Sequence, residues 1–266
     1  MFLNVDNKAV FAATGGKDFD AAKPCVIFIH GAGMDHSCWL LQSRWFAWHG
    51  WSMLAIDLPG HGRSEGDALP TIADLAAWVG RLMDAAGLKT ATLVGHSMGA
   101  IIALETAAAL PVRIERLALL GITAAMQVHP ALLDAAKNDA TKAYEMMTDW
   151  SHGKAAKMGR NQVPGMWMTG NALALFARNK PGVLFADLTA CNTWETGPAT
   201  AAQITCPVHI IASKQDMMTP LRGSKELAAL IPDSDLTELD KCSHMMMAEA
   251  PDAVLDVLID RLGNKI

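Results

Sequence analysis

Five short, almost wholly apolar runs alternate with longer helical patterns, and this alternation constrains the fold more than any other feature of the chain. Cys25–His30, for example, is apolar up to a glycine-rich loop, which is typical of a strand buried on both faces. The other runs are Ser52–Asp57, Thr90–Val94, Leu117–Gly121 and Val208–Ser213, and the helical patterns cover 72–86, 98–110, 220–230 and 251–262. The alternation predicts an α/β fold, a mainly parallel sheet with helices on both faces.

Two further segments add strands to this predicted sheet. Phe2–Val5 and Lys8–Ala13 flank an Asp6-Asn7 turn, which favours a hairpin. Leu236–Leu239 precedes the last helical pattern and is interpreted as a final strand. These elements assign residues 1–121 and 201–266 to one α/β core.

The alternation stops between residues 122 and 200. This stretch has helical segments but no convincing buried strand, and it is rich in Met, Trp and Phe. We therefore predict a helical cap, residues 122–200, inserted over the carboxyl edge of the sheet. About half of its large apolar residues are expected to be ordinary helical core. The underside of such a cap could hold an apolar substrate.

Composition excludes several classes of protein. Apolar residues make up 51% of the 266, so a sizeable core is expected, while the net charge of −5 without a basic cluster excludes a nucleic-acid footprint. The apolar runs, such as Leu117–Met126, are too short to span a membrane, and the first ten residues lack a signal-peptide pattern. The five cysteines form no CxxC pair and suit a reducing compartment. We expect a soluble cytoplasmic protein, and the oligomeric state stays open.

The strongest chemical signal is Gly95-His96-Ser97-Met98-Gly99, between a predicted strand and a predicted helix. So tight a turn strains its central residue, and glycine at both flanks removes the Cβ atoms that would clash. The Ser97 hydroxyl is thereby presented clear of the backbone, next to amides of a helix N-terminus that favour negative charge. This predicts a nucleophilic serine, against the alternative of a merely structural turn residue.

A serine hydroxyl needs a base to take its proton. Of the nine histidines, His30 and His61 lie in glycine-rich loops and are interpreted as architectural, and His96 as packed beneath the turn. His36 stays ambiguous because its loop should lie near the site. His244 follows the last predicted strand and precedes the final helix, where a loop can bring an imidazole over the carboxyl edge of the sheet. We expect His244 to be the base.

The base in turn needs an orienting carboxylate. Asp216 lies in the loop after Val208–Ser213, before the helix expected at Pro220, and is the best candidate. Asp57 opens a glycine-rich loop and Asp187 lies in the predicted cap, so turn or solvated roles explain both better. No carboxylate occurs from 122 to 126, directly after the preceding strand.

The chain order Ser97, Asp216, His244 on this alternating pattern resembles the α/β-hydrolase superfamily, in its small-cap esterase and lipase-like branch. The resemblance extends over essentially the whole chain. It implies that Ser97 is the nucleophile, Asp216 the acid and His244 the base, and that the amides of Ala32 and Met98 form the oxyanion hole. Acyl transfer by these residues requires no metal and no organic cofactor, and isolated histidines without paired carboxylate spacing argue against a zinc site.

Methionines next to the predicted catalytic residues indicate an apolar, adaptable substrate pocket. Met217 follows the acid, Met245 follows the base, and Met166 and Trp167 lie in the predicted cap. We expect these four residues to line the pocket, although methionines also fill irregular cores. The predicted substrates are carboxylic esters with small to medium hydrophobic acyl or aryl groups.

Other functions remain open on the sequence alone. The same three residues could serve a thioesterase, a lactonase, a C–C bond hydrolase or a cofactor-free haloperoxidase-type enzyme, because each uses the same nucleophile and oxyanion hole. A non-catalytic small-molecule receptor on this fold is a further alternative, as is a cap that binds a protein partner such as an acyl carrier.

Overall fold

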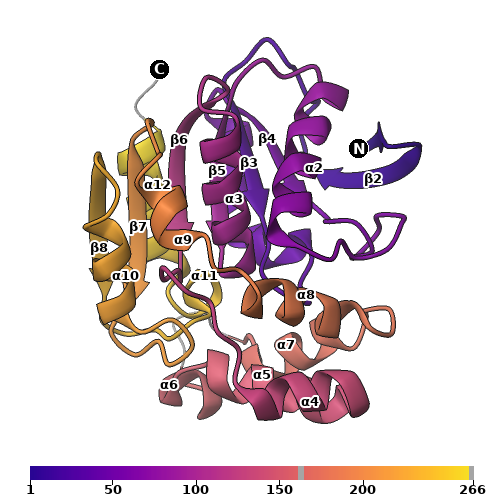
Figure 1. Cartoon of the computed structure of the whole chain (residues 1–266), viewed down its shortest axis with the longest axis vertical. Coiled ribbons are helices and arrows are strands. Elements are labelled where there is room, and N and C mark those ends of the chain that lie inside the picture. Colours follow the sequence, from indigo (N-terminus) through magenta and orange to yellow (C-terminus); the bar gives the residue numbers. More distant parts are fainter. Residues whose placement is uncertain (161–164, 264–266) are drawn as a thin grey trace.

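An eight-stranded sheet lies at the centre of the computed structural model, which describes residues 1–160 and 165–263 (Figure 1). Its order is β1-β2-β4-β3-β5-β6-β7-β8. Strands β3 to β8 pair in parallel, whereas β2 pairs antiparallel with both β1 and β4. The strands are β1 Phe2–Val5, β2 Lys8–Ala13, β3 Cys25–Ile29, β4 Ser52–Ile56, β5 Ala91–His96, β6 Ile114–Leu120, β7 Val208–Ser213 and β8 Ser234–Leu239. The predicted mainly parallel sheet is confirmed.

The register brings the carboxyl ends of the parallel strands to one edge of the sheet. Ile29 at the end of β3 pairs with Gly95, and Ser213 at the end of β7 pairs with Leu239. From β3 the chain continues to β4 on one side and later to β5 on the other, so the strand order reverses at β3. Open parallel sheets bind ligands outside the carboxyl ends of strands at such a reversal.

Helices cover both faces of the sheet. Helix α2 (Ile72–Ala85) packs against α3 (Met98–Ala109) on the face nearer the viewer in Figure 1, and α12 (Pro251–Leu262) packs against α1 (Leu40–Trp48) on the other. The remaining core elements are the 3₁₀ helix η1 (His36–Trp39), α10 (Leu221–Ala228) and α11 (Met246–Glu249). In the part of the chain that the structure describes, no helix is long and apolar enough to cross a membrane.

Helix α1 and the preceding η1 were not expected from the sequence. The reason is the distribution of side chains along α1: Leu40, Leu41 and Trp48 are exposed while Gln42 is fully buried. The helix therefore lacks the apolar stripe by which sequence patterns indicate an amphipathic helix.

The segment between β6 and β7 carries six helices in its described part and no strand. They are α4 Pro130–Asn138, α5 Ala140–Ser151, α6 Lys154–Lys157, α7 Met168–Phe176, α8 Val183–Asn192 and α9 Gly197–Ala201. We call residues 122–200 the β6–β7 insertion; 161–164, and 264–266 of the predicted core, lie outside the described residues. The α4, α5, α7 and α8 helices lie below the sheet in Figure 1, at its carboxyl edge.

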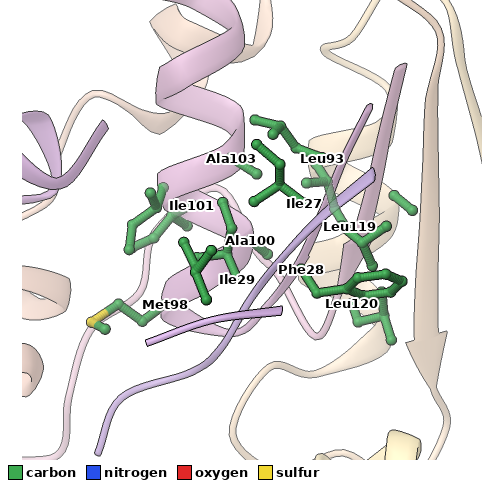
Figure 2. Packing of buried hydrophobic residues seen from close by; sticks show 14 of the residues in the cluster. Ile27, Phe28, Ile29, Leu93, Met98, Ala100, Ile101, Ala103, Leu119 and Leu120 are labelled. Carbon is green, nitrogen blue, oxygen red and sulfur yellow. The ribbon is translucent and has the colours of Figure 1, made fainter. Parts of the chain in front are cut away.

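Buried apolar side chains hold β3, β5 and α3 together (Figure 2). The strands contribute Ile27, Phe28 and Leu93, and the helix contributes Ala100 and Ala103. All five residues are fully buried. Small alanine side chains let the α3 backbone approach the sheet closely, and burying each large apolar side chain contributes about 1.5–3 kcal/mol. This packing fixes the N-terminus of α3, directly after Ser97.

Candidate active site

Ser97 occupies a strained turn between β5 and α3, with φ +53° and ψ −118°. A Cβ on Gly95 would collide with the Gly99 carbonyl, and a Cβ on Gly99 would collide with the carbonyl of Ile29. Glycine is therefore required on both sides of the serine. Non-glycine residues in such a conformation cost about 1–3 kcal/mol and are found mainly at functional sites.

His244 and Asp216 meet at this edge of the sheet, with 2.8 Å between His244 Nδ1 and Asp216 Oδ2. Oδ1 of Asp216 accepts hydrogen bonds from the amides of Met218 and Thr219, and Oδ2 accepts one from Thr219 Oγ1. Burial alone would raise the pKa of Asp216, but His244 and these hydrogen bonds hold it below its usual value. The ionised carboxylate takes the Nδ1 proton as its hydrogen bond, so a neutral His244 keeps Nε2 free to accept a proton.

The backbone of His244 is held by His96, the residue before Ser97. Nε2 of His96 donates to the His244 carbonyl over 2.9 Å, and the two rings lie 4.7 Å apart. Burial, together with the neighbouring His244, lowers the pKa of His96 to about 3, so this ring is neutral. His96 thus links the turn that carries Ser97 to the loop that carries His244.

The peptide before Ala32 orients the Ala32 amide. The Gly31 carbonyl accepts hydrogen bonds from His30 Nδ1 (2.9 Å) and from the Met34 amide (3.2 Å). In a trans peptide the N–H points away from the C=O, so the Ala32 N–H points away from His30. The Met98 amide lies in the first turn of α3, where amides have no partner within the helix and favour negative charge.

A cavity of about 310 Å³ brings these groups together. Ser97, His244 and Ala32 all line it, and Asp216 stands behind His244. Its wall is mostly apolar, and none of the described lining residues is Lys, Arg, Asp or Glu. The other lining residues are Met126, Gln127, Val128, His129, Leu132, Met147, Trp150, Leu188, Cys191, Met217, Met218 and Thr219.

The structure places only one of the four predicted pocket residues, Met217, beside Ser97. Met166 and Met245 line a separate cavity of about 400 Å³ between η1 and α7. Trp167 lines neither cavity and is 73% exposed. For Met245 the cause is local: its amide donates to the Ser151 carbonyl as the chain enters α11, and Met245 lines the second cavity while its neighbour His244 lines the cavity of Ser97.

The lining residues that sequence reasoning did not select come mainly from the β6–β7 insertion. Met147 and Trp150 lie three residues apart on α5 and share a face of that helix. Both belong to the Met- and Trp-rich stretch that drew attention in the sequence. Their spacing of three residues could have indicated that they share a helix face. Which face of α5 is turned toward Ser97, however, depends on tertiary packing.

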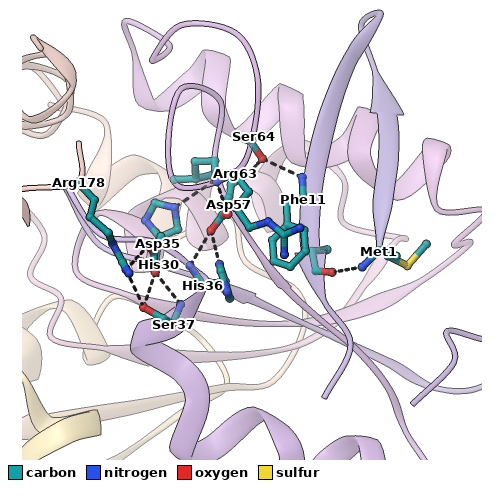
Figure 3. A network of polar contacts seen from close by, with 12 residues as sticks. Met1, Phe11, His30, Asp35, His36, Ser37, Asp57, Arg63, Ser64 and Arg178 are labelled. Carbon is teal, nitrogen blue, oxygen red and sulfur yellow. Dashed lines mark hydrogen bonds and ion pairs between the residues drawn. The ribbon is translucent and has the colours of Figure 1, made fainter. Parts of the chain in front are cut away.

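Polar side chains of the loops after β3 and β4 form a network around Asp57 (Figure 3). Fully buried, Asp57 accepts hydrogen bonds from the amide and Nδ1 of His36 and from the Arg63 amide. Burial opposes the charge, but these hydrogen bonds lower the pKa of Asp57. His36, ambiguous from the sequence, is thus engaged away from the Ser97 cavity, and Asp57 stabilises the loop after β4.

The same network contains Asp35, His36 and Asp57 close enough together to suggest a cation site. Oδ1 of Asp35 accepts the Ser37 amide and hydroxyl, and its Oδ2 pairs with Arg178 over 2.6 Å. Since these oxygens already accept N–H and O–H donors, the cluster fits an internal hydrogen-bond network better than a metal.

Asp187 differs from its sequence interpretation. It is 1% exposed, not solvated, and its Oδ2 accepts hydrogen bonds from the Gly33 amide and from His61 Nε2, both at 2.8 Å. Asp187 belongs to α8 of the insertion, so the contact joins the insertion to two core loops. Nothing near it in the sequence distinguishes it from a surface aspartate.

The fold and the strained serine turn define a hydrolase of the α/β type. A sequence model described as "Alpha/beta hydrolase family" matches residues 26–257, and the chain belongs to this family. Membership, together with the names of the relatives, supports hydrolase activity.

Individual relatives cover the chain to different extents. It is 26% identical to the putative carbamate hydrolase RutD of Enterobacter cloacae, over 92% of this chain and 93% of that protein. A dihydrolipoyllysine-residue acetyltransferase component of the acetoin cleaving system of Cupriavidus necator is 39% identical over 120 residues, which are 44% of this chain but only 30% of that protein. The crystal structure of an enol-lactonase from Burkholderia xenovorans superimposes with a TM-score of 0.87 at 24% identity, covering 99% of this chain and 100% of that one.

Proposed function

We propose that the protein is a serine hydrolase that cleaves carboxylic esters of small to medium hydrophobic acyl or aryl groups. The observation that carries the proposal is the 2.8 Å hydrogen bond between His244 Nδ1 and Asp216, beside the cavity that His244 shares with Ser97. It leaves the second ring nitrogen of His244 to act as a base in that cavity.

The reaction proceeds through an acyl-enzyme. Ser97 Oγ attacks the ester carbonyl carbon while its proton passes to His244 Nε2, and Asp216 stabilises the resulting imidazolium. The amides of Ala32 and Met98 donate to the oxyanion; one such donor is typically worth about 2.7–4 kcal/mol of barrier. The alcohol leaves with the proton from His244. Water then attacks the acyl carbon, His244 takes its proton, and the acid and free Ser97 are released.

The cavity supports uncharged substrates of limited size. Its volume of about 310 Å³ lies at the lower end of the roughly 300–1,000 Å³ typical of small-molecule pockets. Since no cationic side chain occurs among the lining residues that the structure describes, a substrate carboxylate would lack a partner there. Short neutral esters fit both properties.

The β6–β7 insertion acts as a cap in this proposal. Leu132, Met147, Trp150 and Leu188 belong to it and contribute apolar wall to the cavity. The cap thus supplies the surface that binds the acyl or aryl group, while the core supplies Ser97 and His244. Residues 122–200 are the proposed extent of the cap.

Carbamate hydrolysis is the second candidate, because the relatives that span most of the chain include a putative carbamate hydrolase. A carbamate carbonyl can be attacked by the same serine and stabilised by the same amides. The substrate panel below separates the two, and it also covers thioesters and lactones.

The test is a panel of p-nitrophenyl esters from acetate to laurate, with a matched carbamate, thioester and lactone, on wild type, Ser97→Ala and Ser234→Ala. Ser234 begins β8, away from the cavity, and serves as the control. We expect short esters to be cleaved fastest, Ser97→Ala to lose at least ~10³-fold in kcat, and Ser234→Ala to retain activity. A fluorophosphonate should label Ser97, shown by peptide mass spectrometry. Full activity in Ser97→Ala, or labelling elsewhere, would refute the proposal.

A further inference from the structure

The loop after β3, residues 31–35, carries the Ala32 amide and is held peptide by peptide. The peptide before Ala32 is held from the core, through the hydrogen bond from His30 to the Gly31 carbonyl. The next peptide is held through the Gly33 amide, which donates to Asp187 over 2.8 Å. The third is held through the Gly33 carbonyl, which accepts from Asn179 Nδ2 over 2.6 Å.

Two of these three peptides are thus held by the β6–β7 insertion. Asp187 lies on α8 and Asn179 between α7 and α8, 154 and 146 residues from Gly33 in sequence. Arg178 adds an ion pair to Asp35 in the same loop. Because Gly33 has φ +67° and no side chain, the loop has little stiffness of its own at this position. Its conformation depends on the partners that the insertion provides.

The second partner of Asp187 is the ring of His61. His61 Nε2 faces Asp187 Oδ2 at 2.8 Å, and His61 Nδ1 faces the Pro59 carbonyl at 2.9 Å. A carbonyl oxygen and an ionised carboxylate only accept hydrogen bonds, so both ring nitrogens must donate. Beside an ionised Asp187 these two contacts favour the imidazolium form of His61, whose ring is 1% exposed.

The groups around His61 are consistent with this charge. Asp187 approaches from α8 and Asp57 from the end of β4, while the His30 ring lies 4.9 Å away at the end of β3. His30 is neutral, because its Nε2 accepts the Leu58 amide. Burial opposes the charged form of His61, but attraction to Asp187 and the hydrogen bonds outweigh it and raise the pKa of His61.

We propose that Asp187, with the imidazolium of His61, is a positioning residue for the oxyanion hole: it fixes the Ala32–Gly33 peptide from the insertion, so that the Ala32 amide keeps its direction toward the reacting carbonyl. The proposal rests on the proposed esterase function. It makes the insertion a part of the catalytic support as well as a wall of the substrate cavity.

The test compares Asp187→Ala, Asp187→Asn and Thr200→Val. Asp187→Ala removes the acceptor of Gly33, whereas Asp187→Asn keeps an oxygen there and removes the charge. Thr200→Val is the matched control, because buried Thr200 joins the insertion to Glu105 on α3 through a hydrogen bond that does not involve loop 31–35. Each variant is assayed for kcat, KM, thermal midpoint and fluorophosphonate labelling. In wild type at pH 7, ¹⁵N NMR of the His61 ring reports its protonation independently of activity.

We expect Asp187→Ala to lower kcat by ~10–100-fold. This is less than the ~10²–10³-fold loss of kcat when an oxyanion donor is removed, because the Ala32 amide is misdirected but still present. KM should change less than about threefold, since uniform substrate binding is untouched. Asp187→Asn should recover most of kcat, Thr200→Val should retain it all, and the His61 ring should carry protons on both nitrogens.

The outcomes separate the two proposals. Wild-type kcat in Asp187→Ala, in an enzyme that is active and labelled at Ser97, would overturn the positioning role alone. So would an equal loss of kcat in Thr200→Val, or a neutral His61 ring at pH 7. A wild-type protein that cleaves no ester and is not labelled would overturn the proposed function, and the catalytic role of Asp187 with it.

Discussion

The two segments that would stabilise the oxyanion are held in place by different physics. The turn Gly95–Gly99, which carries the Met98 amide, is fixed by backbone contacts: a Cβ on either flanking glycine would collide with a carbonyl. The loop 31–35, which carries the Ala32 amide, is held by side chains, two of them from the β6–β7 insertion. Steric constraint is absolute and independent of pH. Hydrogen bonding to charged groups is graded and titrates with its partners.

The largest effect is therefore expected at the turn. In Gly99→Ala the new Cβ would meet the carbonyls of Ile29 and His30, and backbone cannot move aside cheaply. We expect more than about 3 kcal/mol of destabilisation, at the upper end for single substitutions, and no measurable esterase activity. Denaturant unfolding and the acetate ester assay measure both. Gly80→Ala is the control, since its Cβ meets only the end of the Leu110 side chain; comparable loss there would contradict the steric account.

The next largest effect is expected at His244, the proposed base. Like loop 31–35, it is held by a hydrogen bond to a buried carboxylate. In Asp216→Asn the side chain can donate to His244 Nδ1, which leaves the proton on Nε2 and disables the base. We expect kcat to fall by about 10³–10⁴-fold with the fold retained, as when an orienting carboxylate is replaced by its amide. Exposed Asp240, which pairs with Lys214, is the site of the control variant Asp240→Asn. If Asp216→Asn keeps wild-type kcat, Asp216 is not the orienting acid.

A smaller effect is expected where the insertion binds substrate. Trp150 lines the cavity of Ser97, whereas Trp167 is exposed and lines neither cavity described above. Trp150→Ala should lower kcat/KM for aryl or butyl esters by about tenfold, through lost apolar contact with the acyl group. Trp167→Ala should leave it unchanged. Equal losses in the two variants, measured on the same ester series, would show that the insertion binds substrate elsewhere.

The turn and loop 31–35 also differ in how far the sequence predicts them. Ser97 and its flanking glycines are almost adjacent in sequence, and the steric requirement for glycine there is local. The five residues Gly95–Gly99, at the junction of a strand and a helix, were therefore enough to predict the turn. The contact between Asp216 and His244 was predictable from their positions after the last two strands, because parallel strands bring the loops that follow them to one edge of the sheet. The sheet was predictable for the same reason: its buried strands are continuous apolar runs.

Contacts made across the insertion were not predictable in this way. Asp187 is separated from Gly33 by 154 residues, and its neighbours in α8 give no sign that it is buried. Similarly, Trp150 and Trp167 are both aromatic residues of one Met- and Trp-rich stretch. Which of them faces Ser97 depends on how α5 and α7 rotate against the core, and that is set by packing rather than by composition.

The smallest expected effect is the pH dependence of stability that the His61–Asp187 pair contributes at the loop held by charge. The raised pKa of His61 means that its pairing with Asp187 contributes fully below the unfolded pKa of about 6.5 and is lost as the pH rises through the folded value. Asp216, with a lowered pKa, behaves oppositely: its contribution holds above its unfolded pKa and is lost only as the pH falls through the folded value. Histidines with a lowered pKa, such as His96, contribute a slope of opposite sign near pH 6.5, but they are common to wild type and Asp187→Asn. The difference between the two proteins therefore isolates the His61–Asp187 pair. Thermal midpoints of wild type should fall over this range relative to those of Asp187→Asn, by about 2–4 °C for each kcal/mol lost. A constant difference between the two proteins from pH 6 to 9 would mean that the His61–Asp187 pair does not titrate in this range, and would contradict the expected pH dependence.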